Sequence, residues 1–321
     1  EPVRAHRVLG PGAASGRFAA AHPDPLEGIV GRDSEIAMLL DRWQLAQGGE
    51  GQTVLLCGEP GIGKSRIVEE LRQRIAGEEH VSILYQCSAH HRNTALYPIT
   101  DYFARASGFD RRDTAERKLD KLDALIERND LCVDEVSPLF ALSLGIAVGD
   151  RYPALNMNPH RLREKTAEAL VMRGVELSKR HTLLVVVEDA QWMDPTTEEA
   201  LALFVDYSRD ISALLVATYR PEYEPAWRGH SNVTQLTLNR LGKRQAARLV
   251  NQVTGGRALP AEVRDQIVAK ADGIPLFIEE LTRTVLESNL LVETADGFAL
   301  SGPLPELAIP MTLHDSLMAR L

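Results

Sequence analysis

The chain has 321 residues, 44% of them hydrophobic and 25% charged, which is ordinary for a globular protein of one to three domains. Its 36 basic and 45 acidic residues give a net charge of -9, which argues against broad, nonspecific binding of nucleic acid by this chain. Uninterrupted apolar runs fall short of the roughly 18 residues that a membrane span needs, and the three cysteines lack metal-ligand spacing, so we expect a cytoplasmic protein with reduced thiols and no membrane partner.

The N-terminal part of the chain contains two different segments. Residues 1–26 are rich in Ala, Gly and Pro and lack periodicity, which predicts a linker or tail. A short turn follows and leads into a helix that Asp33 or Ser34 can cap. Because the turn lies just ahead of the phosphate-binding motif described next, it is also a candidate contact to the adenine side of a nucleotide. Its residues are Val30, Gly31 and Arg32.

The most informative stretch is Thr53–Arg66, where an apolar run breaks into G-x-x-x-x-G-K-S between a predicted strand and a predicted helix at 64–76. Glycines in this pattern allow backbone angles that a side chain forbids, and their amides can surround a phosphate at the positive end of the helix. Lys64 can reach the β- and γ-phosphates, and the Ser65 hydroxyl suits Mg²⁺. The predicted nucleotide-binding residues are Gly58, Glu59, Pro60, Gly61, Ile62, Gly63, Lys64, Ser65 and Arg66.

The middle of the chain combines strands with a long insertion at 88–158, to which the sequence assigns no role. The strand that precedes the insertion is predicted at 81–87, and a long helix at 159–179 follows it. Short helices within the insertion are predicted at 96–107, 114–127 and 132–144.

An apolar strand at 183–187 ends in two acids, Glu188 and Asp189. Strands that are apolar on both faces are typical of a parallel sheet covered by helices. One carboxylate is expected to hold Mg²⁺ through water and the other to orient or deprotonate the attacking water, and the sequence leaves open which acid takes which role. Asp194 is predicted to cap the next helix, with Pro195 as its first residue.

A further strand, at 213–219, is followed by Arg220. Ligands of such sheets bind at the carboxyl ends of the strands, so we expect Arg220 to sense the γ-phosphate, although a surface arginine at a strand end is the plainer interpretation. The connection to the next predicted strand, at 233–238, contains two prolines and a glycine and leaves little room for a helix. Ring-forming motor ATPases usually carry a trans-acting arginine on a helix in this place. We therefore favour a slow, self-contained switch over a ring motor.

The order of these elements predicts an α/β fold, a P-loop NTPase three-layer sandwich with a parallel sheet, over residues 27–240. A small helical lid domain is predicted for 241–305, and residues 306–321 begin a helix of a further domain. The lid helices are expected at 243–253, 260–271 and 275–288, followed by a hairpin within 290–300.

Several stretches together resemble the STAND branch of the AAA+-related ATPases: V-G-R-D-S-E, G-E-P-G-I-G-K-S, V-V-V-E-D-A-Q-W-M-D-P, A-T-Y-R-P-E and D-G-I-P-L-F-I-E-E-L. The chain is most similar to the ATPase module of bacterial class III adenylate/guanylate cyclases with tetratricopeptide repeats. It is also similar to the ATPase region of soluble adenylyl cyclase. Two residues depart from the usual pattern: Gln191 stands where the subgroup commonly has His, and Glu188 where many STAND proteins have Asp.

The resemblance implies an ATP/ADP-binding regulatory switch with Mg²⁺ and slow ATP hydrolysis that controls a linked nucleotide cyclase, while the fragment itself makes no cyclic nucleotide. It implies an adenine-side contact by Val30, Gly31 and Arg32, a sensor role for Arg220, and a contact from Pro275 of the lid to base and ribose. It also implies a cyclase domain before residues 1–26, and a winged-helix domain and tetratricopeptide repeats after the lid, with 306–321 as the first winged-helix segment. Two other functions fit the same residues: the ATPase module of a DNA-binding transcriptional regulator, and an ADP-holding interaction module without turnover.

Overall fold

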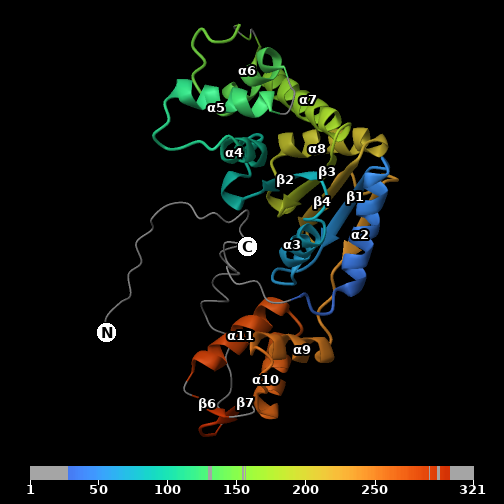
Figure 1. Ribbon diagram of the computed structural model, residues 1–321, viewed down its shortest axis with the longest axis vertical. Coiled ribbons are helices and arrows are strands. Elements are labelled where there is room, and N and C mark those ends of the chain that lie inside the picture. Colours follow the sequence, from blue (N-terminus) through green and yellow to red (C-terminus); the bar gives the residue numbers. More distant parts are fainter. Residues whose placement is uncertain are drawn as a thin grey trace.

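The computed structural model describes residues 28–128, 132–153, 155, 157–288, 290–294 and 297–303; the predicted tail at 1–26 and winged-helix segment at 306–321 lie outside these ranges. At its centre is one parallel five-stranded sheet in the order β2-β3-β4-β1-β5 (Figure 1). β4 therefore separates the strand that leads into the P-loop from the strand that ends in the two acids. The strands are β1 (Gln52–Cys57), β2 (His80–Gln86), β3 (Thr182–Glu188), β4 (Ala213–Tyr219) and β5 (Val233–Thr237).

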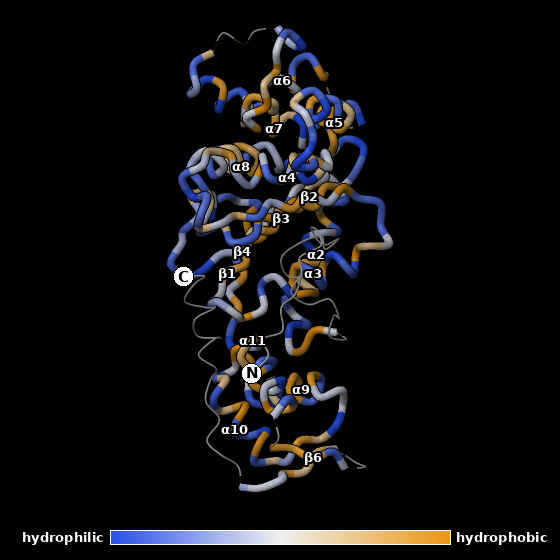
Figure 2. Tube along the Cα trace, turned by 90° about the vertical axis from the view of Figure 1, so that its left-hand side faces the viewer, coloured by the Kyte–Doolittle hydropathy of each residue, from blue (hydrophilic) through white to orange (hydrophobic). Residues whose placement is uncertain are grey.

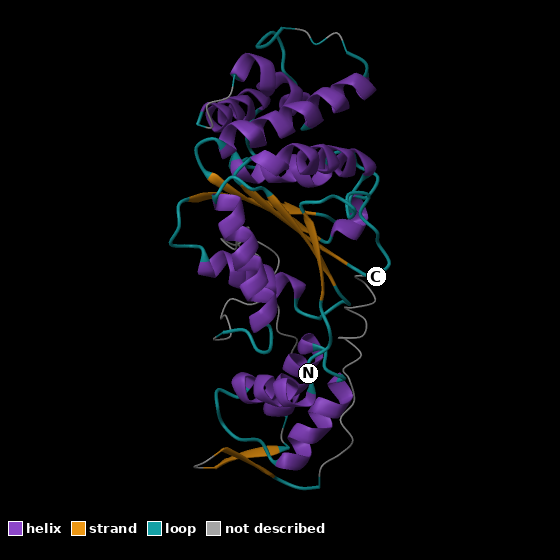
Figure 3. Ribbon diagram, turned by 90° about the vertical axis from the view of Figure 1, so that its right-hand side faces the viewer, coloured by secondary structure: helices purple, strands orange, loops and turns teal. Residues whose placement is uncertain are grey.

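Helices cover both faces of this sheet, which confirms the predicted three-layer α/β sandwich (Figures 1 and 3). On β3, Leu184 and Val186 pack into one layer, whereas Leu183 and Val185 pack into the other. Successive strand residues point to opposite faces, so a strand that is covered on both sides is apolar throughout. The first layer is formed by α2 (Asp33–Gln47) and α3 (Lys64–Arg74). The second contains α4 (Tyr97–Ala106), α7 (Pro159–Ser178) and α8 (Pro195–Tyr207).

The insertion at 88–158 contributes α4 to the second layer and adds two further helices on the side away from the sheet (Figure 1). α4 packs on β2, and α5 (Ala115–Glu127) packs on α6 (Val133–Ser143), which in turn packs on α7. A buried carboxylate holds the connection that returns to α7. Asp123 accepts hydrogen bonds from the Tyr152 hydroxyl at 2.6 Å and from Arg151 Nη2 at 2.7 Å. The insertion is thus a helical extension of the core, packed against it and internally ion-paired.

The residues after β5 form the expected helical lid, with an apolar core of its own (Figure 2). Ile267, Ile278 and Leu281 lie at the centre of that core. Figure 1 shows the lid beyond the end of the sheet that carries the P-loop, where α11 and α9 face the core. Its elements are α9 (Lys243–Val253), α10 (Ala261–Ala271), α11 (Pro275–Glu287) and an antiparallel hairpin of β6 (Leu291–Thr294) and β7 (Gly297–Leu300).

The structure confirms the predicted cap of one helix and contradicts the predicted cap of another. Asp194 caps α8 as expected, because its side chain accepts a hydrogen bond from the Thr197 amide at 3.0 Å. Capping of α2 by Asp33 or Ser34 is wrong: the helix starts one residue earlier, with Arg32 as its N-cap and no side-chain cap bond. The first helical hydrogen bond runs from the Ile36 amide to the Arg32 carbonyl, so Asp33 lies inside the first turn.

The connection from β4 to β5 contains no helix within residues 220–232, all of which the structure describes, in agreement with its two prolines and glycine. Short 3₁₀ turns occur elsewhere, at Ala89–His91, Ala190–Trp192 and Ser208–Asp210. In the described ranges, no helix combines the length and the apolar character that crossing a bilayer requires.

Candidate nucleotide-binding site

The P-loop connects β1 to α3 and presents backbone amides at the start of that helix. Gly61 and Gly63 have positive φ angles of 75° and 99°, which only glycine adopts readily. Gly63 is the N-cap of α3 and provides no side-chain cap bond. The amides of Lys64 and Ser65, in the first turn, have no partner from the helix itself. The loop therefore points positive backbone dipoles toward the space where a phosphate fits.

The side chain of Lys64 places a buried ammonium group beside the backbone amides of the P-loop. Its Nζ donates hydrogen bonds to the carbonyl oxygens of Gly58 at 2.7 Å and Glu59 at 3.0 Å, so the side chain folds back along the loop. Burial lowers the pKa of Lys64 to about 8; the negative charge of Asp189 opposes this shift, and the positive charge of Arg220 adds to it. The backbone amides of the loop and the ammonium group of Lys64 thus meet at one place, which favours an anionic ligand.

The two acids that follow the β3 apolar run occupy different positions. Glu188 is the last residue of β3 and continues the alternation of Leu184 and Val186, which places it on the α3 side of the sheet. Its Oε2 accepts a hydrogen bond from Gln86 Nε2, at the end of β2, with a distance of 3.0 Å. The side chain is buried, so this amide contact orients the carboxylate.

Asp189 lies just beyond the strand in the left-handed conformation, with φ of 57° and ψ of 47°. Its amide donates to Thr218 Oγ1 on β4 at 3.0 Å, and Gln191 Nε2 donates to its Oδ1 at 3.2 Å. Of the two acids, Asp189 is the one whose negative charge acts on Lys64. Thr218 did not emerge from the sequence patterns. The signal that identifies it is a hydroxyl residue in a strand that is otherwise apolar and buried on both faces.

Arg220 follows β4 at the same edge of the sheet and is only 5% exposed. Its guanidinium carbon lies 4.9 Å from the centre of the Trp192 ring, a distance typical of cation–π contacts. Its charge acts on Lys64. The structure therefore brings Lys64, Asp189 and Arg220 together. This was expected, because each of them follows the carboxyl end of a strand of the sheet.

The turn ahead of α2 is bound to the P-loop on one side and to the lid on the other. Arg32 Nη2 donates to the carbonyl oxygens of Ile62 at 3.2 Å and Asn239 at 2.8 Å. A side chain at Gly31 would collide with Gln245 of α9, since a Cβ there would lie 2.6 Å from it. The guanidinium of Arg32 is thus used by the protein itself, and an adenine-side contact by Val30, Gly31 and Arg32 stays a prediction.

The lid touches the P-loop directly through the start of α11. Pro275 is the first residue of that helix, and the next amide, of Leu276, donates to the Gly61 carbonyl at 3.2 Å. The side chains of Ile274 and Leu276 flank Gly61, where a Cβ would approach them to 3.2 and 3.1 Å. Pro275 thus lies next to the phosphate loop, and its contact with base and ribose stays a prediction.

A second connection between lid and loop is ionic, and sequence patterns did not reveal it. Arg240, between β5 and α9, forms an ion pair with Glu59 of the P-loop, with 2.7 Å from Nη2 to Oε2. Its Nη1 pairs with the carboxylate of Asp272, at the end of α10. No local pattern distinguishes Arg240 from other exposed arginines, because its partners are remote in the chain.

The residues present fit a magnesium nucleotide. The open loop at Gly63, where a Cβ would meet nothing within 4 Å, leaves room beside the amides, and Lys64 supplies positive charge. Ser65 lies in the first turn of α3, and Glu188 lies on the sheet face that α3 covers. Among the described residues, no group of three or more His, Cys, Asp or Glu side chains could hold a metal ion. A hydroxyl, a carboxylate, water and phosphate oxygens together form the ligand set that Mg²⁺ prefers.

Comparisons with known proteins agree with this site. The family described as AAA ATPase domain matches residues 28–216, and a domain of unknown function matches residues 242–299. An uncharacterized protein of Rhizobium meliloti is 30% identical over 294 residues, which are 89% of this chain and 28% of that protein. Adenylate cyclase type 10 of Oryctolagus cuniculus is 23% identical over 280 residues, which are 82% of this chain and 16% of the cyclase. The chain thus spans less than a third of the length of these curated relatives.

Among solved structures, a STAND protein with a tetratricopeptide-repeat sensor from Pyrococcus horikoshii matches with a TM-score of 0.46 and 14% sequence identity. The match covers 92% of this chain and 33% of the Pyrococcus chain. RuvB of Thermotoga maritima has a TM-score of 0.44 and 11% identity over 90% of this chain and 69% of its own. The family match includes the P-loop, both acids and most of β4. Because it extends over more than half of the 321 residues, the chain belongs to the AAA ATPase domain family.

Proposed function

We propose that this ATPase module is a nucleotide-operated switch of the STAND type, which binds ATP or ADP with Mg²⁺, hydrolyses ATP slowly and controls a linked nucleotide cyclase. The observation that carries the proposal is the hydrogen bond from the Leu276 amide to the Gly61 carbonyl. A lid helix that is bonded to the phosphate loop responds when a ligand reshapes that loop. A ligand shifts the equilibrium between two positions of the lid only if it interacts differently with them. In this proposal, the contact between lid and loop provides that difference.

The residues have separate roles in the proposed switch. P-loop amides and Lys64 bind the phosphates, and Ser65 and Glu188 hold Mg²⁺, the latter through water. The metal, when bound, neutralises charge on the phosphate oxygens. Asp189, which lies just beyond the strand end and whose charge acts on Lys64, orients or deprotonates the attacking water. Arg220 stabilises the charge that develops on the γ-phosphate.

Slow turnover follows from the connection between β4 and β5. Residues 220–232 contain no helix that could present an arginine to a neighbouring subunit. Without a residue supplied in trans, stabilisation of the transition state depends on the groups of this chain and its bound metal, with Lys64 and Arg220 as the cationic side chains. An arginine of this kind raises turnover by about 10³–10⁵-fold where it operates.

The cyclase link is supported by the similarity to adenylate cyclase type 10 over 82% of this chain. In this proposal a cyclase domain precedes the module and a winged-helix and tetratricopeptide region follows it, in one cytoplasmic protein. The module itself binds no nucleic acid directly, in keeping with its net charge of -9.

A distance measurement tests the switch. Fluorophores are placed at Gln73→Cys on α3 and Arg248→Cys on α9, both exposed, in a Cys132→Ser background because Cys132 is the exposed native thiol. The distance is expected to differ between ADP and a non-hydrolysable ATP analogue, and Lys64→Ala is expected to remove the difference. Equal distances with both nucleotides, despite tight binding, would instead support a module that holds ADP without switching.

The cyclase link needs a separate measurement on the full-length protein. Cyclic-nucleotide production is compared between wild type and Lys64→Ala, with Lys243→Ala, an exposed lysine of the lid, as the control. Only the P-loop variant is expected to change the output. An unchanged output, or a natural chain that carries a DNA-binding domain in place of a cyclase, contradicts the link.

A further inference from the structure

The first helix of the insertion, α4, is joined to the segment after β3 by one buried carboxylate. Asp194 is only 2% exposed, and its Oδ1 accepts hydrogen bonds from two backbone amides, those of Leu96 and Thr197, each at 3.0 Å. Its Oδ2 accepts a further hydrogen bond from the Thr197 hydroxyl at 2.5 Å. Leu96 is the N-cap of α4, so a single oxygen atom joins the start of α4 to the start of α8.

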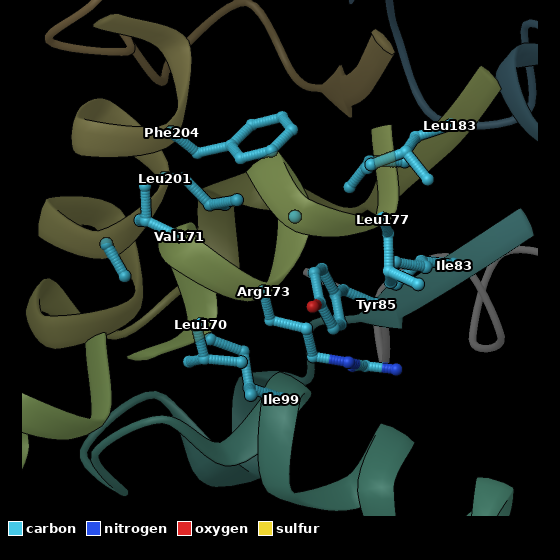
Figure 4. Close-up of a pocket in the computed structure, with 13 residues that line it drawn as sticks. Ile83, Tyr85, Ile99, Leu170, Val171, Arg173, Leu177, Leu183, Leu201 and Phe204 are labelled. Atoms are coloured by element: carbon cyan, nitrogen blue, oxygen red, sulfur yellow. The ribbon is translucent and has the colours of Figure 1, made fainter. Parts of the chain in front are cut away.

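Leu96 has an unusual backbone conformation, with φ of 58° and ψ of 21°. Residues other than glycine rarely adopt these left-handed angles, and one that keeps them is held by its surroundings. The Leu96 side chain is buried in the apolar core, and its amide is held by Asp194. One turn further on, Ile99 lines a small apolar cavity together with Leu201 of α8 (Figure 4). The start of the insertion is thus fixed to α8 through its backbone and its side chains.

Asp194 also ends a compact turn that begins at Asp189 and reaches the nucleotide-binding site. Within this turn the Trp192 amide donates to the Asp189 carbonyl at 2.9 Å, and the next amide donates to the Ala190 carbonyl at 3.0 Å. Asp189 is the proposed base, and the centre of the Trp192 ring lies 4.9 Å from the guanidinium carbon of Arg220. Because these internal bonds hold the turn together, the point at which Asp194 is fixed influences where the Asp189 carboxylate lies.

We propose that Asp194 is a positioning residue for ATP hydrolysis: through its bond to the Leu96 amide, the insertion holds the turn that presents Asp189 to the attacking water. The inference rests on the proposed function, because it concerns the hydrolysis step. Capping of a helix needs only a bond to an amide three residues on, as Asn158 provides for α7 at 2.8 Å. The bond from Asp194 to Leu96 goes beyond the cap and connects the insertion to the site.

The groups that bind the nucleotide lie outside this turn. Lys64 and the P-loop amides belong to the connection from β1 to α3, and Glu188 is the last residue of β3. Displacement of the turn should therefore lower kcat, because a small misplacement of a reacting group is costly, and should leave nucleotide affinity unchanged. Loss of a helix cap with no further role would instead lower the Tm and leave kcat intact.

Variants of Asp194 in the 321-residue chain separate these roles. Asp194→Asn retains an oxygen that accepts from both amides, so it should keep most of the wild-type kcat. Asp194→Ser keeps the cap of α8, but its side chain is one bond shorter and moves the oxygen away from the Leu96 amide. It should lower kcat by about 10–100-fold, and Asp194→Thr, with the same reach, should do the same. Asn158→Ala, which removes the cap of α7, is the matched control and should lower the Tm without changing kcat.

Phosphate release at saturating Mg²⁺-ATP gives kcat, calorimetry gives the ADP affinity, and thermal denaturation gives the Tm. Wild-type ADP affinity in Asp194→Ser, together with its reduced kcat, is the expected result. Absence of phosphate release by the wild-type chain would overturn the proposed hydrolysis and this inference together. If the wild type hydrolyses ATP, full kcat in the serine and threonine variants would overturn the inference alone. So would an equal loss of kcat in Asp194→Asn, or a loss of ADP affinity that parallels the loss of kcat.

Discussion

Arg240 and Glu59 lie 181 positions apart in the chain, yet their side chains form an ion pair of 2.7 Å that joins the lid connection to the P-loop. Both side chains are 45% exposed, so solvent screens the pair and it contributes little to stability. Its importance lies in its location. Arg240 also binds the Asp272 carboxylate of the lid, so one guanidinium connects the phosphate loop with the lid.

The first prediction concerns this connection. Glu59→Gln should leave the Tm almost unchanged but accelerate amide exchange at Leu276, whose acceptor is the P-loop carbonyl of Gly61, by about two- to fivefold with ADP bound. Arg240→Gln should have the same effect. Hydrogen exchange measures both, and the double variant should show less than the sum of the two changes. Fully additive changes would mean that the pair does not couple lid and loop.

The second prediction is that Lys64→Ala abolishes tight binding of ATP and ADP while the fold is retained. Lys64 is the only cationic side chain within the G-x-x-x-x-G-K-S loop. In the absence of nucleotide the variant should be at least as stable as wild type, because the lowered pKa means that burying this charge is unfavourable at neutral pH. Calorimetry gives the affinity and denaturant unfolding the stability. Lys243→Ala is the control, and unchanged ADP affinity in a folded Lys64→Ala protein contradicts the P-loop assignment.

The third prediction is a pH dependence of ADP binding. Without ligand the pKa of Lys64 is about 8, and a bound phosphate raises it because the ammonium form gains a partner. Below pH 8 the amine is already protonated, so affinity is highest there. Above pH 8 binding must take up a proton, and affinity should fall by up to about tenfold per pH unit.

Calorimetry in buffers with different ionisation heats measures this proton uptake directly. Ser65→Ala, which removes no titrating group, should retain the same slope at lower affinity. A wild-type affinity that is constant between pH 7 and 9.5 would contradict the role of Lys64.

The fourth prediction concerns turnover. ATP hydrolysis by the chain should be far slower than the roughly 1–100 s⁻¹ of kinases and should not depend on protein concentration. Asp189→Asn should reduce it further by about 10²-fold or more while Mg²⁺-ATP still binds, because the variant lacks the base. Glu188→Gln should instead raise the Mg²⁺ concentration required by about 10–100-fold.

Phosphate release measured against Mg²⁺ and protein concentration separates these cases. Fast, concentration-dependent turnover would indicate a ring-forming motor. If the two variants showed the opposite effects, the roles of Glu188 and Asp189 would have to be exchanged.

The fifth prediction is that Pro275→Ala weakens ADP binding by about 0.5–2 kcal/mol, estimated from partial loss of one apolar side chain's burial. The fold should persist, because a helix start tolerates alanine. Pro260→Ala, at the start of α10, is the matched control. Hydrogen exchange across residues 273–288 with and without ADP provides a second readout. Equal protection in both states, with unchanged affinity, would reduce Pro275 to a helix-start residue.

Local sequence signals predicted most elements of the fold. β4 and α9 have the predicted bounds, and the P-loop lies between a strand and a helix as its motif requires. Asp194 caps α8 because its carboxylate reaches the Thr197 amide three residues away, and the same oxygen also accepts a hydrogen bond from the remote Leu96 amide. The mistaken cap of α2 has the opposite origin. The side chain of Arg32, the observed N-cap, is held by the remote carbonyls of Ile62 and Asn239, contacts that a local pattern does not reveal.

Tertiary structure alone decided which groups meet. The insertion of β4 between β1 and β3 brings the Thr218 hydroxyl to the Asp189 amide, and strand order is absent from any local pattern. Packing of the lid on the core decided that Arg240 meets Glu59 and that Leu276 meets Gly61. Hydrophobic periodicity and turn chemistry act over a few residues and are therefore legible in the sequence. Contacts between distant segments depend on how whole elements pack, and the free energy of that packing is shared among many residues, none of which carries the information by itself.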